Sequence, residues 1–334
     1  MSDQVLIQQM RSAVDHELRS CVSTQFTSLP ETFRLMVEYQ MGWEDGRSTS
    51  TGKRLRPLIL LAACHALGIN WASALPAAAA IELVHNFSLV HDDIQDHSET
   101  RRGKPTIWVK WGEPQAINIG DAILALATIE IYTLSFDTEK KLSSARAMQN
   151  AVFSLTKGQY LDLANENSEK TSIEDYWLMV KGKTGALFSV CFEIAAILAG
   201  KSPSEIRQYA DLGLQLGLVF QVQDDALGIW GDNLITGKST ESDIHSRKMT
   251  FPIIFALENL PEFGNLWVKC KQFTQEDVDQ LKTILDRSDV YQVTEMKANV
   301  LYQEFVEKFD VLFKNHEKSS VLKSMVQNLL SRNN

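Results

Sequence analysis

The chain has little that would mark a secreted or nucleic-acid-binding protein. Its 334 residues include only four cysteines (Cys21, Cys64, Cys191 and Cys270), which are widely spaced and form no CxxC pair. We therefore expect reduced, mostly buried thiols in a cytoplasmic protein. Acidic residues outnumber basic ones, 42 to 33, and the formal net charge is −9. This balance argues against nucleic acid as a partner, because phosphate backbones are bound by basic surfaces.

The chain also has no long uninterrupted apolar run. Its first 20 residues carry acids among the apolar ones, which is unlike a signal peptide. The most apolar stretch, residues 185–200, is interrupted by Glu193 and is too short to cross a bilayer. We therefore expect no transmembrane segment, and a buried core helix over this stretch.

Proline and strand-like alternation are scarce as well. None of the 8 prolines falls between Pro114 and Pro203 or after Pro261, and apolar residues recur mostly at helical spacing. This pattern predicts helices over residues 4–22, 31–44, 54–67, 73–96, 115–133, 140–165, 173–199, 203–231, 250–258, 275–288 and 292–331. Ser202 and Glu205 form a capping box at the start of one of them. With no linker or fixed repeat, we predict a single all-α domain with a core at about 40–260 and a polar helical part at 261–334.

Three aspartates follow one apolar helical stretch. The segment AAAAIELVHNFSLVHDDIQD ends in Asp92, Asp93 and Asp96. Asp92 and Asp96 share one helix face, where two like charges are unfavourable unless a cation lies between them. Carboxylate oxygens suit Mg²⁺, which keeps places for water and substrate phosphates. The alternative is a solvated acidic helix end, but the apolar run before the acids favours a metal site.

A second acidic pair, Asp224 and Asp225, ends the run LVFQVQDD. The next position on the same face is Gly228, and Asp232 lies about two turns beyond Asp224 if the helix persists. Alone, this segment fits a metal ligand and an ordinary acidic helix terminus equally well. Two helices with inward carboxylates are, however, how helical bundles build a metal site.

Basic residues occur in five short clusters flanked by Gly, Pro or Thr. They are Lys53 to Arg56, Arg101 to Lys104, Lys183, Lys238 and Lys248. Each cluster alone would be read as solvated surface. Beside two aspartate clusters in an acidic protein, they predict polyphosphate substrates held by Mg²⁺ and by cationic side chains over an apolar cavity.

The order of these motifs resembles that of the trans-isoprenyl diphosphate synthases. Between residues 52 and 252 the chain reads GKRLRP, ELVHNFSLVHDDIQD, RRGKPT, NIGDAILA, GQYLDL, KTGALF, FQVQDD, TGKSTESDI and RKMTFP. The resemblance implies a homodimer of an isoprenoid synthase-type bundle, with long helices around a deep central cavity. It also implies a Mg²⁺-dependent prenyltransferase that condenses isopentenyl diphosphate head-to-tail with an allylic diphosphate, without a redox or nucleotide cofactor.

The resemblance implies a role for each matching residue. Two Mg²⁺ ions would be bound by Asp92 and Asp96, with Asp93 beside them, and a third by Asp224, with Asp225 beside it. The allylic diphosphate would be held by Lys183, Gln221, Lys238 and Arg101. Isopentenyl diphosphate would be held by Lys53, Arg56, His85 and Arg102, although His85 also fits a hydrogen-bonded core histidine. Lys248 would lie near the metals and Thr184 beside the reacting carbon. Asp92, Asp96, Asp224, Lys183 and Arg101 would carry the catalysis.

Product length is implied by the residues before the first aspartate. Phe87, followed by Ser88 and by no insertion in DDIQD, resembles synthases that stop at twenty carbons, geranylgeranyl diphosphate. Fifteen- and twenty-five-carbon products (farnesyl and farnesylgeranyl diphosphate) remain alternatives. So do a terpene cyclase of the same fold and a non-catalytic partner subunit. The matching residues for a second diphosphate argue against the cyclase, and the intact first cluster argues against the subunit.

Overall fold

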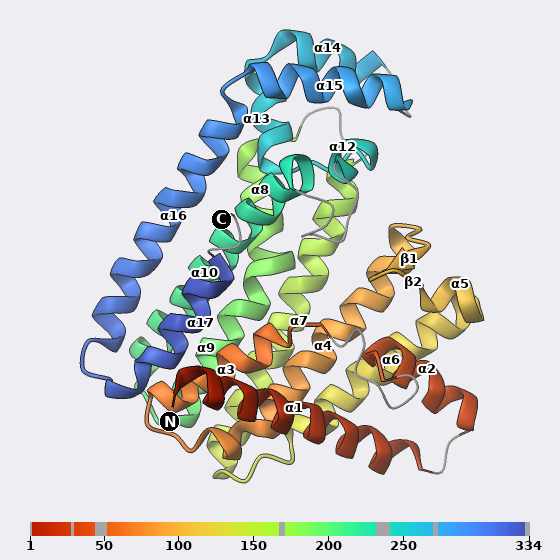
Figure 1. Cartoon of the computed structure of the whole chain (residues 1–334). Helices are drawn as coiled ribbons and strands as arrows, with labels where there is room; N and C mark the ends of the chain where they lie inside the picture. Colours follow the sequence, from red (N-terminus) through yellow and green to blue (C-terminus); the bar gives the residue numbers. More distant parts are fainter. Residues whose placement is uncertain are drawn as a thin grey trace. The chain divides into compact units, whose positions relative to one another are not determined.

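Helices form nearly all of the regular structure. The computed structural model describes residues 2–27, 30–43, 52–166, 171–231, 241–269 and 273–330 (Figure 1). Within these ranges the only strands are β1 (Thr100–Arg101) and β2 (Lys104–Pro105), which pair as a small antiparallel hairpin. The all-α prediction is confirmed. The chain separates into two compact units, one of Met1–Val152, Val190–Asp211 and Leu312–Asn328, the other of Phe153–Ser189, Leu212–Val311 and Leu329–Asn334. That the whole chain forms a single domain stays a prediction.

The first unit is organised around α4 (Leu75–Gln95). This helix packs along α6 (Glu113–Ile131) and contacts α1 (Asp3–Phe26) and α3 (Leu55–Ala66) (Figure 1). The four alanines at 77–80 are fully buried. Their small side chains let the neighbouring helices approach α4 closely. The unit also holds α2 (Glu31–Met41), η2 (Trp71–Ala74), α5 (Ile107–Trp111), η4 (Glu317–Ser319), most of α9 (Ala186–Leu198) and α17 (Ser320–Leu330), and the first parts of α7 (Thr138–Glu166) and α10 (Pro203–Trp230).

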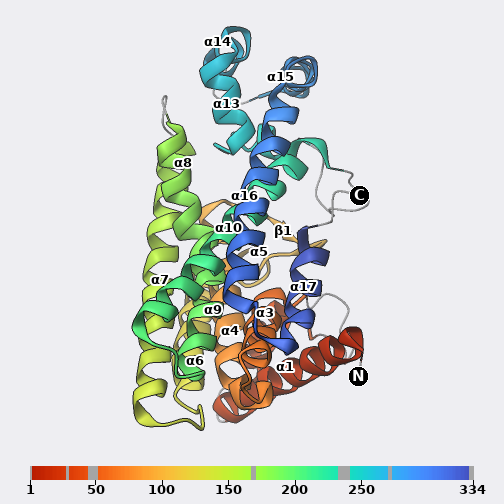
Figure 2. The same cartoon turned by 90° about the vertical axis from the view of Figure 1, so that its left-hand side faces the viewer.

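The second unit contains the remaining parts of α7 and α10. It adds α8 (Ile173–Val180), the π-helical turn η3 (Lys181–Gly185), α12 (Ser242–His245), α13 (Phe251–Asn259), α14 (Pro261–Lys269), α15 (Gln275–Arg287) and most of α16 (Val290–Phe313). α14 lies beside α15 and also packs on α13 (Figure 2). A Cβ at Gly158 of α7 would lie 2.0 Å from the backbone nitrogen of Lys183, so the two backbones touch and only glycine fits there.

The helix boundaries agree with the sequence except near the C-terminus. The expected capping box is present, since the N–H of Ser202 donates to the carboxylate of Glu205 at 2.8 Å and the N–H of Glu205 donates to the hydroxyl of Ser202 at 3.3 Å. The expected single helix over 292–331 is wrong, because α16 ends at Phe313 and α17 begins at Ser320. Neither Gly nor Pro marks this break, although residues 314–320 (KNHEKSS) are all polar and interrupt the apolar spacing. The short helices α5 and α12 and the helix α14 were also not expected.

One described helical stretch, Trp71–Gln95, is long and apolar enough to cross a membrane. Of its most apolar window, 72% is buried inside the protein. This burial is what the central helix of a folded unit shows, so length and composition alone do not make α4 a membrane span.

Two glutamates meet where α1 packs on α6. The side chain of Glu130 is buried and hydrogen-bonds with Glu17. Burial, reinforced by the charge of Glu17, raises the pKa of Glu130 from 4.5 to about 7. An acid with a raised folded-state pKa contributes stability that is present below pH 4.5 and is lost as the pH rises through about 7.

We expect the Glu130→Gln variant to lose this pH dependence. The fall in Tm between pH 5 and pH 8 should be smaller for the variant than for the wild type, because glutamine has no proton to lose. Thermal unfolding at both pH values measures the difference. An equal fall in the two proteins would contradict the assignment.

Candidate active site

The first aspartate cluster lies at the C-terminal end of α4. Asp92 is in the last turn, and the N–H of Asp96, just past the helix, donates to the Asp92 carbonyl at 2.8 Å. Carboxylates are unfavourable at this negative pole of the helix dipole unless a cation is near. The buried Oδ1 of Asp96 has no hydrogen-bond partner within the described ranges. A carboxylate oxygen left in this way fits a divalent cation.

Asp93, between these two acids, is turned toward Arg101. It is buried, and its Oδ1 lies 2.7 Å from both Nε and Nη2 of Arg101 on β1. Burial raises the pKa of Asp93 to about 6, although Arg101 opposes that shift. Asp93 therefore anchors the guanidinium of Arg101, a role that differs from the metal binding expected beside Asp92 and Asp96.

The next predicted residues, Arg56 of α3 and His85 of α4, lie together. The Nη1 of Arg56 is 3.4 Å from the Nε2 of His85. Burial first, and then Arg56, lower the pKa of His85 well below its usual value, so the imidazole is neutral and accepts from the guanidinium. The neighbouring Arg54 forms structural ion pairs instead. It is buried, with Glu82 2.7 Å and Asp15 3.0 Å from its guanidinium nitrogens, so it joins α3 to α4 and α1.

The GKRLRP and RRGKPT segments meet in the first unit. A Cβ at Gly52, whose φ is +68°, would lie 2.9 Å from the Nη2 of Arg102. Lys53 follows directly and is exposed. Arg101, Arg102 and Lys104 line a small pocket at the hairpin. Basic residues from two sequence motifs thus surround one part of this unit, as the prediction of a diphosphate site requires.

The second acidic pair resembles the first, since one acid is partly exposed and the other is buried among protein donors. Asp224 of α10 is half-buried, whereas Asp225 is buried and accepts three hydrogen bonds. The hydroxyl of Tyr176 (2.6 Å) and the N–H of Phe251 (3.0 Å) donate to its Oδ2, and the Nε2 of Gln221 (2.7 Å) donates to its Oδ1. Burial raises the pKa of Asp225 to about 7 despite these donors. Asp225 thus ties α10 to α8 and α13.

Lys183 and Thr184 lie on the π-helical turn η3. Lys183 forms an ion pair with Asp162 of the GQYLDL segment on α7. The hydroxyl of Thr184 donates to the Oε1 of Gln221 at 2.5 Å. Such turns often occur at functional sites. Asp162 carried no role in the sequence analysis although its motif was recognised, and Tyr176 was not singled out, since nothing in the sequence indicates its partner.

Gly228 is explained by a neighbour from α12. A Cβ at this position would lie 2.0 Å from the Oδ2 of Asp243, so the carboxylate of Asp243 fills the space of a side chain at 228. The carbonyl of Asp243 accepts from the N–H of Lys248 at 2.9 Å. The remaining predicted residues here, Lys238 and Asp232, lie outside the described residues.

The proposed length-determining residues are packed on α4. The ring of Phe87 is buried and meets the ring of His91 edge-on, with centroids 5.0 Å apart. The hydroxyl of Ser88 donates to the carbonyl of His85 at 2.9 Å. A Cβ at Gly120 of α6 would lie 2.2 Å from the Nε2 of His91, so α6 supports the ring that holds Phe87.

The donors fit Mg²⁺ bound together with substrate. In the described part of the chain, no group of three or more His, Cys, Asp or Glu residues could hold a metal ion by itself. Mg²⁺ commonly takes one or two carboxylates and completes its shell with water and substrate phosphates. Asp92 and Asp96 are the pair of acids that would supply such oxygen ligands.

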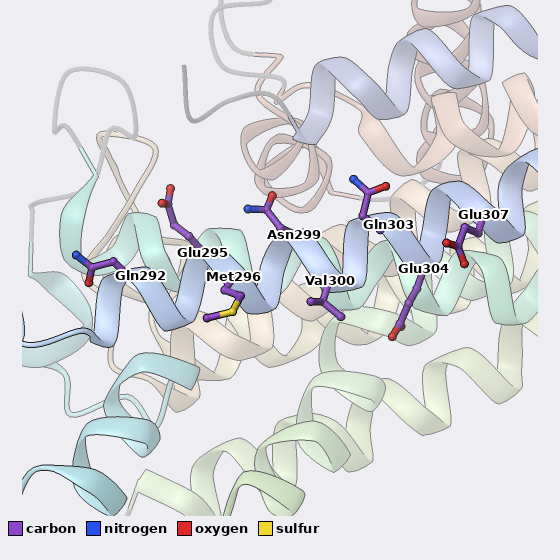
Figure 3. A pocket seen from close by; sticks show the side chains of 8 residues that line it. All are labelled: Gln292, Glu295, Met296, Asn299, Val300, Gln303, Glu304 and Glu307. Carbon is purple, nitrogen blue, oxygen red and sulfur yellow. The ribbon is translucent and has the colours of Figure 1, made fainter.

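A separate groove follows α16 in the second unit (Figure 3). It is lined by Gln292, Glu295, Met296, Asn299, Val300, Gln303, Glu304 and Glu307. It contains none of the predicted site residues, and its acids are unsuited to a diphosphate.

Known proteins match the chain over most of its length. Residues 46–287 match the family described as polyprenyl synthetase. The farnesyl diphosphate synthase of Mycobacterium tuberculosis is 39% identical over 72% of this chain and 68% of its own. The geranylgeranyl diphosphate synthase of Saccharolobus solfataricus is 32% identical over 96% and 95%. A polyprenyl synthetase structure from Streptomyces coelicolor has a TM-score of 0.86 and 30% identity, covering 97% of this chain and 99% of its own. This chain therefore belongs to the polyprenyl synthetase family and is a prenyltransferase of the trans-isoprenyl diphosphate synthase type with the all-α isoprenoid synthase fold.

Proposed function

We propose that the protein condenses isopentenyl diphosphate with an allylic diphosphate and that its main product is geranylgeranyl diphosphate. The end of α4 carries this proposal. There, Asp92 and the unpartnered oxygen of Asp96 lie beside an arginine that Asp93 already anchors. Carboxylates for Mg²⁺ next to an oriented guanidinium are the groups that a leaving diphosphate needs.

The first step is loss of the allylic diphosphate. When bound, Mg²⁺ supplies Lewis-acid neutralisation of the charge that develops on the leaving oxygens. From the resemblance, Asp92 and Asp96 would hold two of the ions and Asp224 a third. Arg101, fixed by Asp93, and Lys183, fixed by Asp162, would donate hydrogen bonds to the diphosphate. Lys238 and Lys248 are assigned to the same part of the reaction from sequence.

The second substrate needs cations of its own. Lys53, Arg56 and Arg102 would bind isopentenyl diphosphate, and neutral His85 would orient the guanidinium of Arg56. The double bond of isopentenyl diphosphate then forms a carbon–carbon bond to the allylic cation. A proton leaves the adjacent carbon for the released diphosphate, so no side-chain base is required. Apolar side chains exclude water that would otherwise trap the cation.

We also propose a cytoplasmic homodimer. Large apolar side chains are exposed on two helices, Ile117 and Ile129 on α6 and Leu142, Phe153 and Tyr160 on α7. Phe153 is 75% and Tyr160 70% exposed, and a second copy of the chain would cover them.

Similarity does not decide the product length, since relatives named as farnesyl and as geranylgeranyl diphosphate synthases both match the chain. The proposed length therefore depends on Phe87. We expect Phe87→Ala to lengthen the product by one isoprene unit or more, because it removes the ring that would stop the growing chain. Chromatography of the dephosphorylated products measures the shift. Phe26→Ala on α1 is a matched control, since it also removes a buried ring but should leave product length unchanged. An unchanged distribution in Phe87→Ala would contradict the assignment.

Three pairs of incubations test the activity itself. The protein is mixed with Mg²⁺ and isopentenyl diphosphate plus dimethylallyl, geranyl or farnesyl diphosphate, and each allylic diphosphate is also tested alone. Chain growth that consumes isopentenyl diphosphate supports the proposal. Hydrocarbon formed from an allylic diphosphate alone would indicate a cyclase, and no reaction at all would indicate a non-catalytic subunit.

A further inference from the structure

A chain of four hydrogen-bonded side chains runs through the second unit from α8 to the π-helical turn. We call it the relay: Tyr176, Asp225, Gln221 and Thr184. We infer that Tyr176 and Asp225 are positioning residues that set the direction of the Thr184 hydroxyl through Gln221. This inference rests on the proposed function, because Thr184 is assigned there to the reacting carbon.

The contacts of the relay are short and continuous. Tyr176 donates to Asp225 at 2.6 Å, Gln221 donates to Asp225 at 2.7 Å, and Thr184 donates to Gln221 at 2.5 Å. The backbone N–H of Phe251, which can only donate, also donates to Asp225 at 3.0 Å. Asp225 is therefore an acceptor for donors from α8, α10 and α13.

The direction of every bond follows from the carboxylate. The ionised carboxylate only accepts, and in the structure the NH₂ group of Gln221 is the one turned toward Asp225. The amide oxygen of Gln221 then faces Thr184, whose single hydroxyl proton is used to reach it. The Thr184 oxygen is left with lone pairs and no free proton. In the proposed reaction it presents an electron-rich oxygen to the cation and cannot donate a proton.

The relay also gives Asp225 a role that differs from its neighbour's. Both of its oxygens accept hydrogen bonds from the protein, one from Gln221 and the other from Tyr176 and Phe251. These donors occupy three of about four acceptor positions on the carboxylate, which leaves it poorly placed to coordinate a metal ion. Asp224 is therefore the metal-binding acid of this pair, and Asp225 the positioning one.

Reversing the polarity of the relay tests this inference. In Asp225→Asn, the new amide oxygen keeps the bonds from Tyr176 and Phe251, so its NH₂ group faces Gln221. Gln221 must then flip and present its own NH₂ to Thr184, which is forced to accept. In Gln221→Glu, two carboxylates face each other. The double variant Asp225→Asn/Gln221→Glu restores every donor–acceptor match and the same charge, and Thr184 again donates.

The expected result is non-additive. Each single variant should lower kcat about 10- to 100-fold, the range for a lost or reversed hydrogen bond to a charged group. The double variant should lose clearly less than the product of the two single losses, although the carboxylate at position 221, where the allylic diphosphate is expected to bind, keeps its kcat below that of wild type. The Mg²⁺ concentration for half-maximal rate should stay the same in Asp225→Asn. A double variant that loses as much as the singles combined would overturn the relay, and a raised Mg²⁺ requirement in Asp225→Asn would show a metal ligand instead.

Removing the first hydroxyl gives an independent test. Tyr176→Phe should lower kcat about 3- to 10-fold and leave the KM for isopentenyl diphosphate unchanged. Tyr209→Phe is the matched control, because the Tyr209 hydroxyl bonds only to the Leu312 carbonyl at 3.3 Å among the bonds described and should leave kcat unchanged. Equal kcat losses in the two variants would contradict a positioning role for Tyr176.

Failure of the relay is distinguishable from failure of the proposed function. If wild type consumes isopentenyl diphosphate and the double variant does not recover, only the relay is wrong. If wild type shows no turnover, the proposed function is wrong. In that case the Tm values of the four proteins still report on the relay, since Asp225→Asn and Gln221→Glu should each lower Tm and the double variant should regain most of the loss.

Discussion

Replacing Asp92 with alanine should lower kcat about 1000-fold or more and leave the helical fold intact. The loss reflects the place of Asp92 at the end of α4, where it lies at the negative end of the helix dipole and, in the proposed mechanism, would share a cation with Asp96. Without this carboxylate the charge on the leaving diphosphate is no longer neutralised. The measurement is kcat with saturating substrates over a Mg²⁺ titration, together with circular dichroism.

A matched change elsewhere controls for the loss of an acid. Asp211 is exposed on α10 and belongs to none of the motifs, so Asp211→Ala should keep wild-type kcat. Near-normal turnover of Asp92→Ala at high Mg²⁺ would show that Asp92 holds no metal.

Replacing Arg54 with methionine should lower the free energy of unfolding by about 3–5 kcal/mol, the usual effect of removing one partner from a buried ion pair. The side chains of Arg54 and Glu82 are 1% and 4% exposed, and their charged atoms lie 2.7 Å apart. Methionine fills similar space but leaves the Glu82 charge buried without its partner. Denaturant unfolding measures the change, and we expect a fall in Tm of about 5–10 °C.

A surface pair in the same unit provides the control. Arg34 and Glu38 of α2 are separated by 3.6 Å, with side chains 44% and 33% exposed. Arg34→Met should cost about 0.5 kcal/mol or less, as solvent-exposed pairs do. Similar losses in Arg34→Met and Arg54→Met would show that burial does not decide the effect.

The sequence predicted the helices and the first acidic cluster well, because both depend on local patterns. Apolar spacing and scarce proline indicated α4, and the spacing of Asp92 and Asp96 places both at its end. The proximity of Arg56 to His85 was expected only from the resemblance, and the structure shows it directly at 3.4 Å.

Other features depend on contacts between distant segments and were not predictable from local patterns. Asp93 and Asp225 were predicted as metal residues beside their neighbours, which stays a prediction, and local patterns did not indicate that Arg101 and Tyr176 would donate to them. The reason for Gly228 lies in Asp243, which belongs to another helix. The break after Phe313 carries no glycine or proline signal.

The most direct test follows labelled isopentenyl diphosphate into product. With wild-type protein, Mg²⁺ and farnesyl diphosphate, we expect the label in a twenty-carbon diphosphate, one diphosphate released for each unit added, and no reaction when EDTA removes the metal. Absence of label from any longer chain with every allylic diphosphate, in protein shown to be folded, would contradict the proposed condensation.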